Sequence, residues 1–185
     1  MSDNSSRSAL VLSGGGVRGA YEVGVVRGIV DVLGLTATDP APFRIFAGAS
    51  VGAINATFLA AHTDRGDLGV DALAGVWTSF EVDRHLRIDP LGLWGWPRRP
   101  QLFRGGADLG PRLGRSFLDP RPLERLVRES VRWESLHENA RTGSLHALIV
   151  AALDITTGRT TLFTELAPGA TFRPSPDPHR HAQRE

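Results

Sequence analysis

A repeated order of local patterns constrains the fold of this chain more than any other feature of its sequence. An apolar segment, a glycine-containing turn and an apolar helical pattern follow one another at residues 8–33 and again at 43–62. This alternation is typical of parallel strands joined through helices, because a parallel connection needs a long crossover. The sequence therefore predicts an α/β fold, a mostly parallel sheet with helices packed on its faces.

The two predicted helices differ in the placement of their apolar residues. In the first, apolar side chains recur every four residues, which predicts one stripe facing the sheet or a neighbouring helix. They are Val17, Tyr21, Val25, Ile29 and Leu33. The second helix, residues 51–62, is apolar nearly all round and is expected to be buried. The uncharged run 45–61 is shorter than the roughly 20 apolar residues of a membrane span, so we interpret it as a buried strand and helix.

The later part of the chain has the pattern of a β-hairpin. Residues 145–166 read as two strands around a turn at 154–159. Residues 167–185 have no apolar periodicity and residues 1–7 are polar, so we expect both ends to be disordered. Residues 8–166 remain as one domain, since a chain of 185 residues can build one sizeable core.

Composition excludes several kinds of chemistry. The sequence contains no Lys and no Cys, which rules out a Schiff-base lysine, a P-loop lysine, disulfides, thiol catalysis and thiolate metal sites. The formal net charge of +1 provides no overall field to attract nucleic acid. No histidine pair has metal-ligand spacing beside carboxylates, so we expect no metal site.

The turn between the second predicted strand and its helix, within residues 43–62, carries the pattern G-x-S-x-G at Gly48, Ser50 and Gly52. A serine at a sharp strand-to-helix turn has a strained backbone, and the flanking glycines remove side chains that would clash. The turn exposes the hydroxyl and places the Val51 N–H at the start of a helix, where it favours a developing oxyanion. We interpret Ser50 as a nucleophile; the alternative is a plain βα turn with an incidental serine.

The turn between the first predicted strand and its helix, within residues 8–33, is a glycine loop followed by Arg18 and Gly19. Its residues are Gly14, Gly15 and Gly16. Glycines that open a helix expose consecutive N–H groups to an anion or oxyanion, and Arg18 adds a permanent charge. The same letters satisfy the dinucleotide fingerprint G-x-G-x-x-G, which needs an acidic residue about 20 positions later at a strand end. Asp39 has a suitable distance but lies in a turn, which argues against a dinucleotide site.

Together, these two constellations resemble the N-terminal signature of patatin-like phospholipases. The resemblance is carried by residues 9–19 and 46–55 and resumes at 148–159. It implies a three-layer α/β/α fold and a lipid or ester acyl hydrolase that uses no cofactor. The implied partner is a lipid or acyl-ester substrate, with peripheral membrane contact and no nucleic acid. Because residues 1–8 lack the apolar core of a secretory signal, we expect a cytoplasmic protein.

The resemblance also implies roles for single residues. Ser50 matches the family's nucleophile, the glycine loop with Arg18 matches its oxyanion hole, and Gly19, Gly48 and Gly52 are motif glycines. The family pairs its serine with an aspartate in a D-G-G or D-G-A motif and uses no histidine. This sequence contains no Asp-Gly dipeptide. We therefore expect the domain to be incomplete on its C-terminal side, as a fragment or as a natural truncation.

Other candidates for the base are less well supported. Asp154 begins a Thr-Thr-Gly segment, where a turn-capping role is expected. A Ser–His–Asp triad is open in principle, since G-x-S-x-G also belongs to α/β-hydrolases. His179 and His181 lie in the expected tail, and His146 starts a buried strand. The other histidines lie in or beside helical segments, where a solvated side chain is the default; they are His62, His85 and His137.

Two further functions stay open: a catalytically silent patatin-like module that binds lipid or a partner, and a nucleotide-binding enzyme. An aromatic and basic cluster contains Trp94, Trp96, Pro97, Arg98, Arg99 and Phe103. We favour an ordinary packed loop for this cluster over a lid or a patch at a lipid interface.

Overall fold

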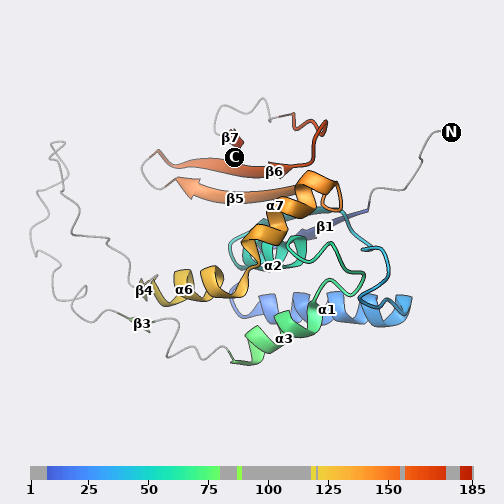
Figure 1. The fold of residues 1–185 in the computed structure, drawn as a ribbon. Helices are drawn as coiled ribbons and strands as arrows, with labels where there is room; N and C mark the ends of the chain where they lie inside the picture. The colour runs from blue at the N-terminus through green and yellow to red at the C-terminus, as the bar shows by residue number, and fades with distance from the viewer. Residues whose placement is uncertain are drawn as a thin grey trace, which may run out of the picture. The chain divides into compact units, whose positions relative to one another are not determined.

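The described part of the chain falls into two compact units. The computed structural model describes residues 8–79, 87–88, 118–119, 121–154, 157–173 and 180–184 (Figure 1). The first unit is Met1–Ser79 with Glu129–Glu185, and the second is Phe80–Arg128. Two expectations, the disordered N-terminus and the cluster around Trp94 and Trp96, lie outside the described residues.

The first unit is built on a five-stranded sheet. In spatial order its strands are β1 (Ala9–Leu12), β2 (Ile45–Ala49), β5 (Ala147–Asp154), β6 (Arg159–Leu166) and β7 (Arg180–Arg184). β1, β2 and β5 are parallel neighbours, β5 and β6 form an antiparallel hairpin, and β7 is parallel to β6. The predicted α/β fold with a mostly parallel sheet is confirmed, and so is the predicted hairpin.

Helices pack beside this sheet in the first unit. They are α1 (Arg18–Leu33), α2 (Val51–Ala60), α3 (Val70–Ser79) and α7 (Trp133–Thr142). α2 packs on β1, β2 and β5, and the other three pack against α2 (Figure 1). Phe46 on the α2 side of the sheet is fully buried, whereas Val11 and Leu153, on the opposite face, are exposed. No described helix is long and apolar enough to cross a membrane.

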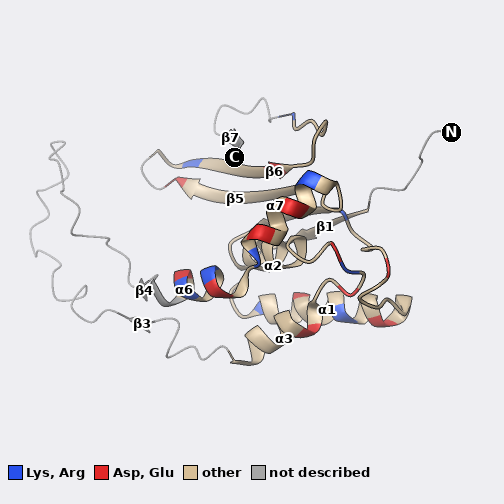
Figure 2. Ribbon diagram, in the orientation of Figure 1, with Lys and Arg blue, Asp and Glu red and all other residues tan. Residues whose placement is uncertain are grey.

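The second unit contributes short elements. Strands β3 (Arg87–Ile88) and β4 (Leu118–Asp119) pair antiparallel, and most of α6 (Arg121–Ser130) follows them. Basic and acidic residues are interspersed along α6, as they are along α1 in the first unit (Figure 2). Neither helix therefore carries a charge of one sign, which fits the formal net charge of +1.

α2 is the centre of the core, as its apolar sequence predicts. Ala56, Leu59 and Ala60 have no exposed surface, and Phe58 is 4% exposed. Small residues let the helix approach the strands closely, and Phe58 and Leu59 fill the space around them. Burial of one such large apolar side chain stabilises the fold by about 1.5–3 kcal/mol. The core thus lies directly beneath the turn that carries Ser50.

The apolar stripe predicted for α1 is wrong. The buried residues of this helix are Gly19, Val23, Val26 and Val30. The exposed members of the predicted stripe are Val17, Tyr21, Val25 and Leu33. Because α1 is apolar on several sides, its periodicity allows two stripes, and the packing of neighbours decides between them. Gly19 fits against α3, where an added Cβ would lie 2.6 Å from the Trp77 ring.

Strand β7 corrects the expectation of a disordered tail over residues 167–185. It pairs in parallel register with β6, with Thr160 opposite Arg180. β7 is one of the two edge strands of the described sheet, opposite β1. Such a strand gains its order from backbone hydrogen bonds to one neighbour. Apolar periodicity in the sequence does not indicate those bonds.

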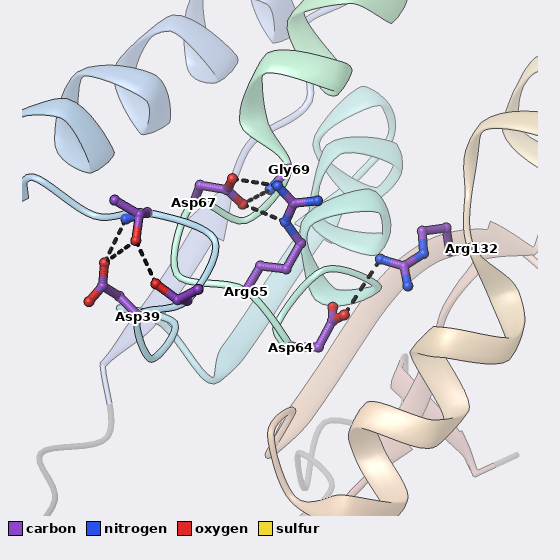
Figure 3. A network of polar contacts seen from close by, with 8 residues as sticks. Asp39, Asp64, Arg65, Asp67, Gly69 and Arg132 are labelled. Atoms are coloured by element: carbon purple, nitrogen blue, oxygen red, sulfur yellow. Dashed lines mark hydrogen bonds and ion pairs between the residues drawn. The ribbon is translucent and has the colours of Figure 1, made fainter.

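Polar contacts stabilise two loops, one after α2 and one after α1 (Figure 3). Arg65 donates two hydrogen bonds to the Asp67 carboxylate, at 2.8 and 2.6 Å, and the Gly69 N–H donates a third at 3.0 Å. The hydrogen bond from Arg65 lowers the pKa of Asp67. In the loop after α1, the Asp39 carboxylate accepts the N–H of Thr36 at 2.8 Å and its hydroxyl at 2.6 Å.

His62 is buried, contrary to the solvated side chain predicted from its helical surroundings. Its Nδ1 lies 2.8 Å from the carbonyl oxygen of Phe58, and its ring stacks on that of Phe58 with centroids 4.5 Å apart. Gly69 makes room for the imidazole, since an added Cβ would lie 2.6 Å from it. Burial lowers the pKa of His62. These contacts make His62 part of the core, close to the C-terminal end of α2.

Candidate active site

Ser50 occupies the turn between β2 and α2. Its φ of 54° and ψ of −129° are values that residues with a side chain rarely adopt. The residue is the N-cap of α2, yet its side chain makes no capping hydrogen bond. Ser50 is also exposed. A strained turn thus holds the hydroxyl at the positive end of a helix.

Backbone packing requires glycine at both flanking positions of the motif. An added Cβ on Gly48 would clash with the carbonyl group of Gly52. An added Cβ on Gly52 would clash with the Leu12 carbonyl and lie 2.6 Å from the carbonyl oxygen of Ser13. These obstacles are backbone atoms, which cannot rotate aside as a side chain can. The two glycines therefore bring β1, β2 and α2 together at the turn.

The glycine loop after β1 lies against Ser50. β1 and β2 are parallel neighbours with Leu12 opposite Gly48, so both turns leave the same edge of the sheet. An added Cβ on Gly14 would lie 3.2 Å from the Cβ and 3.9 Å from the Oγ of Ser50. The two motifs, which are distant in sequence, therefore meet at one place.

Backbone N–H groups at this place are available to a ligand. Within the part of the chain that the structure describes, the N–H groups of Gly14, Gly15 and Gly16 donate no hydrogen bond. Gly16 has a φ of 59°, a left-handed conformation that glycine adopts without steric cost. Val51 is the first residue of α2, and the first N–H groups of a helix have no acceptor within it. Unpaired donors beside an exposed hydroxyl can stabilise an oxyanion.

Arg18 lies over the glycine loop. An added Cβ on Gly15 would lie 2.7 Å from the Nε of Arg18, so the absent side chain leaves room for the guanidinium group. Arg18 is exposed and begins α1. Its permanent positive charge therefore stands where an anion bound to the loop would be attracted.

Gly19 fixes the direction in which α1 leaves the loop. An added Cβ there would lie 2.6 Å from the ring of Trp77 and 2.8 Å from a methyl group of Val51. α1 is thereby packed against both α3 and the first residue of α2. The predicted site residues from both motifs are thus brought into one neighbourhood.

A polar cluster that sequence reasoning missed adjoins the glycine loop. The Glu22 carboxylate accepts the Ser13 N–H at 2.8 Å and the Ser13 hydroxyl at 3.0 Å. Asn55, which is 1% exposed, donates to the Gly19 carbonyl at 3.0 Å and accepts from the Trp77 indole at 2.9 Å. An asparagine inside a helix that is otherwise apolar is the sequence signal for such a cluster, because buried amides need partners.

The described residues do not supply a base to Ser50. Among them, no hydrogen bond joins the Ser50 hydroxyl to a carboxylate or an imidazole. Asp154 accepts the Thr157 hydroxyl at 2.7 Å and the Thr157 N–H at 3.4 Å, as expected for a turn cap. Nor does the described part of the chain contain a group of His, Asp and Glu side chains that could hold a metal ion.

Comparison with protein families adds independent evidence. Residues 10–182 match the family described as patatin-like phospholipase, a range that includes both motifs and the β5–β6 hairpin. Searches of curated proteins and of solved structures found no match. The family match covers nearly the whole chain, and the chain therefore belongs to the patatin-like phospholipase family.

Proposed function

We propose that this protein is a serine acyl hydrolase that cleaves acyl esters of lipids, with Ser50 as its nucleophile. The observation that supports this most strongly is the contact between two motifs. Ser50, with a φ of 54°, lies against Gly14, whose N–H is free among the described residues. Family membership supports the coarser assignment to lipid acyl hydrolases.

The reaction has two steps. The Ser50 Oγ attacks the ester carbonyl carbon, and its proton passes to a base that lies outside the described residues. N–H groups of the glycine loop and of Val51 stabilise the negative oxygen that forms. The C–O bond to the alcohol then breaks, the alcohol leaves with a proton, and an acyl-enzyme remains. Water attacks this ester in the same way, which releases the fatty acid and restores the serine.

Three groups contribute electrostatically in this proposal. The amino-terminal ends of α1 and α2 both lie at the site, and each carries a partial positive charge. The Arg18 guanidinium adds a full charge beside Gly15. A developing oxyanion is stabilised by all three, and water does not need to reorganise around it.

Hydrolysis of nitrophenyl acyl esters tests the proposal. The wild-type chain should release nitrophenol, and Ser50→Ala should release it at the uncatalysed rate. Ser79→Ala is the matched control, since Ser79 is an exposed serine whose hydroxyl donates to the Val76 carbonyl. Equal hydrolysis by wild type and Ser50→Ala would show that another group acts.

A second candidate function is suggested by the absence of a base for Ser50 among the described residues. A chain in which no described carboxylate or imidazole is hydrogen-bonded to the Ser50 hydroxyl could bind acyl chains without cleaving them. A fluorescent fatty acid would then bind the wild type and Ser50→Ala with equal affinity, and neither protein would release nitrophenol. Peripheral membrane contact and a cytoplasmic location belong to both proposals, and vesicle co-sedimentation measures the former.

A further inference from the structure

The two ends of the glycine loop are linked to α2, one directly through Asn55 and the other through Glu22 of α1. At the start of the loop, Ser13 donates its N–H and its hydroxyl to one oxygen of Glu22. At the other end, the Gly19 carbonyl accepts a hydrogen bond from Asn55 of α2. Asn55 also lies 3.4 Å from the second oxygen of Glu22. One carboxylate and one amide therefore join the two ends of the loop to α2.

We propose that Glu22 and Asn55 are positioning residues that hold the oxyanion loop in register with Ser50. This inference rests on the proposed function, because it assigns the cluster a role in that reaction. Neither side chain touches the reacting atoms. Each acts through the loop, by fixing where the N–H groups of Gly14, Gly15 and Gly16 stand relative to the Ser50 hydroxyl.

Glu22 has the chemistry that this role needs. A carboxylate is the only common side chain that offers acceptors without competing donors. Glu22 takes up both donors of Ser13 with one oxygen and faces Asn55 with the other. With the Ser13 N–H occupied, the free N–H groups of the loop begin at Gly14, the residue in contact with Ser50.

Asn55 has the complementary chemistry. Its amide donates to the Gly19 carbonyl and accepts from the Trp77 indole, so both ends of the side chain have partners. Its position in α2 is one helical turn beyond Val51. Since Asn55 is almost fully buried, loss of a partner would leave a costly unsatisfied amide, which makes the arrangement rigid.

Rigidity of this kind should act on the chemical step. Donors of an oxyanion hole must lie within hydrogen-bond distance of the transition state, and a misplacement of about 1 Å can cost about 100-fold in rate. Loss of Glu22 should therefore slow acylation of Ser50 and leave ground-state binding of the ligand largely unchanged.

The test uses Glu22→Ala in the full chain, with Asp39→Ala as its matched control. Asp39 makes the same pair of hydrogen bonds, to the N–H and hydroxyl of Thr36, in a loop outside the site (Figure 3). A fluorophosphonate probe reports the saturating labelling rate of Ser50. We expect Glu22→Ala to label about 10- to 100-fold more slowly than wild type, with Asp39→Ala unchanged. Glu22→Gln should restore only part of the rate, because its carbonyl oxygen can accept both Ser13 donors while its NH2 group would face the Asn55 amide donor.

Amide hydrogen exchange of the segment 13–19 separates failure of this inference from failure of the proposed function. If the wild type is not labelled, the proposed hydrolase function fails. Faster exchange of this segment in Glu22→Ala, and not in Asp39→Ala, would then still support the positioning of the loop. The inference would be overturned if exchange of this segment were unchanged in Glu22→Ala, or if folded Glu22→Ala were labelled at the wild-type rate.

Discussion

Gly14 lies so close to Ser50 that a Cβ added to it would be 3.2 Å from the Cβ of Ser50. This contact joins the loop after β1 to the turn after β2, two segments that belong to different strand–turn–helix units. It depends on the parallel pairing of β1 with β2, which sends both turns to one edge of the sheet. In open α/β sheets, ligands bind at this carboxyl-end edge.

Gly14→Ala should slow the reaction of Ser50 and leave the fold intact. The added methyl group would be in tight contact with the Ser50 side chain, which has to move by a few tenths of an ångström. We expect labelling by a fluorophosphonate to slow by about 10-fold, with little change in Tm. Gly24→Ala is the control, because an added Cβ there meets nothing within 4 Å. That variant should label normally and gain about 1 kcal/mol of stability.

Gly52→Ala should prevent folding rather than only slow the reaction. Its added Cβ would meet the carbonyl groups of Leu12 and Ser13, which are backbone atoms. β1 would have to separate from α2 to make room. Circular dichroism should show loss of the cooperative thermal transition. A Gly52→Ala protein with the wild-type Tm would contradict the packing described for this turn.

Acid should destabilise the protein through His62. Burial lowers the pKa of His62 in the folded chain, so the unfolded chain binds a proton more readily. The free energy of unfolding is therefore unaffected by this residue above its unfolded pKa of about 6.5 and falls as the pH drops below it. Urea denaturation at about pH 7.5 and pH 5.5 measures this loss.

The loss should be smaller in His62→Gln, although this variant starts from a lower stability. His137→Gln is the control, since His137 is an exposed histidine outside the core. The carboxylates whose pKa is lowered, those of Asp39, Asp67 and Glu138, titrate below this pH window. An equal loss in wild type and His62→Gln would exclude His62 as the cause.

Asp154→Ala should weaken the β5–β6 turn without affecting Ser50. The Asp154 carboxylate accepts the hydroxyl and N–H of Thr157, and its carbonyl accepts the Gly158 N–H. Loss of the side-chain contacts should lower stability by about 0.5–1.5 kcal/mol. The rate of Ser50 labelling should stay at the wild-type value. Loss of labelling by a folded Asp154→Ala would instead identify Asp154 as the base.

Local sequence patterns predicted the parts of the fold that depend on local chemistry. G-x-S-x-G between an apolar strand and an apolar helix indicates a strained serine turn, and Ser50 has the positive φ that this requires. Alternation of strands and helices predicts a mostly parallel sheet, and β1, β2 and β5 are parallel neighbours in the structure. Both predictions rest on steric rules that act over a few residues.

Features that depend on distant partners were not predictable in this way. The buried stripe of α1 is selected by Trp77 and Val51, which fit against Gly19. The burial of His62 depends on Gly69 and the loop after α2. β7 depends on its pairing with β6. In each case a single-element pattern is compatible with two outcomes, and tertiary contacts decide between them.

Covalent labelling of Ser50 tests the central claim most directly. The wild-type chain, Ser50→Ala and Ser79→Ala would be treated with a fluorophosphonate probe under conditions where circular dichroism shows all three to be folded. The account predicts labelling of the wild type and of Ser79→Ala, and no labelling of Ser50→Ala. A folded wild-type chain that stays unlabelled, or labelling that persists in Ser50→Ala, would contradict it.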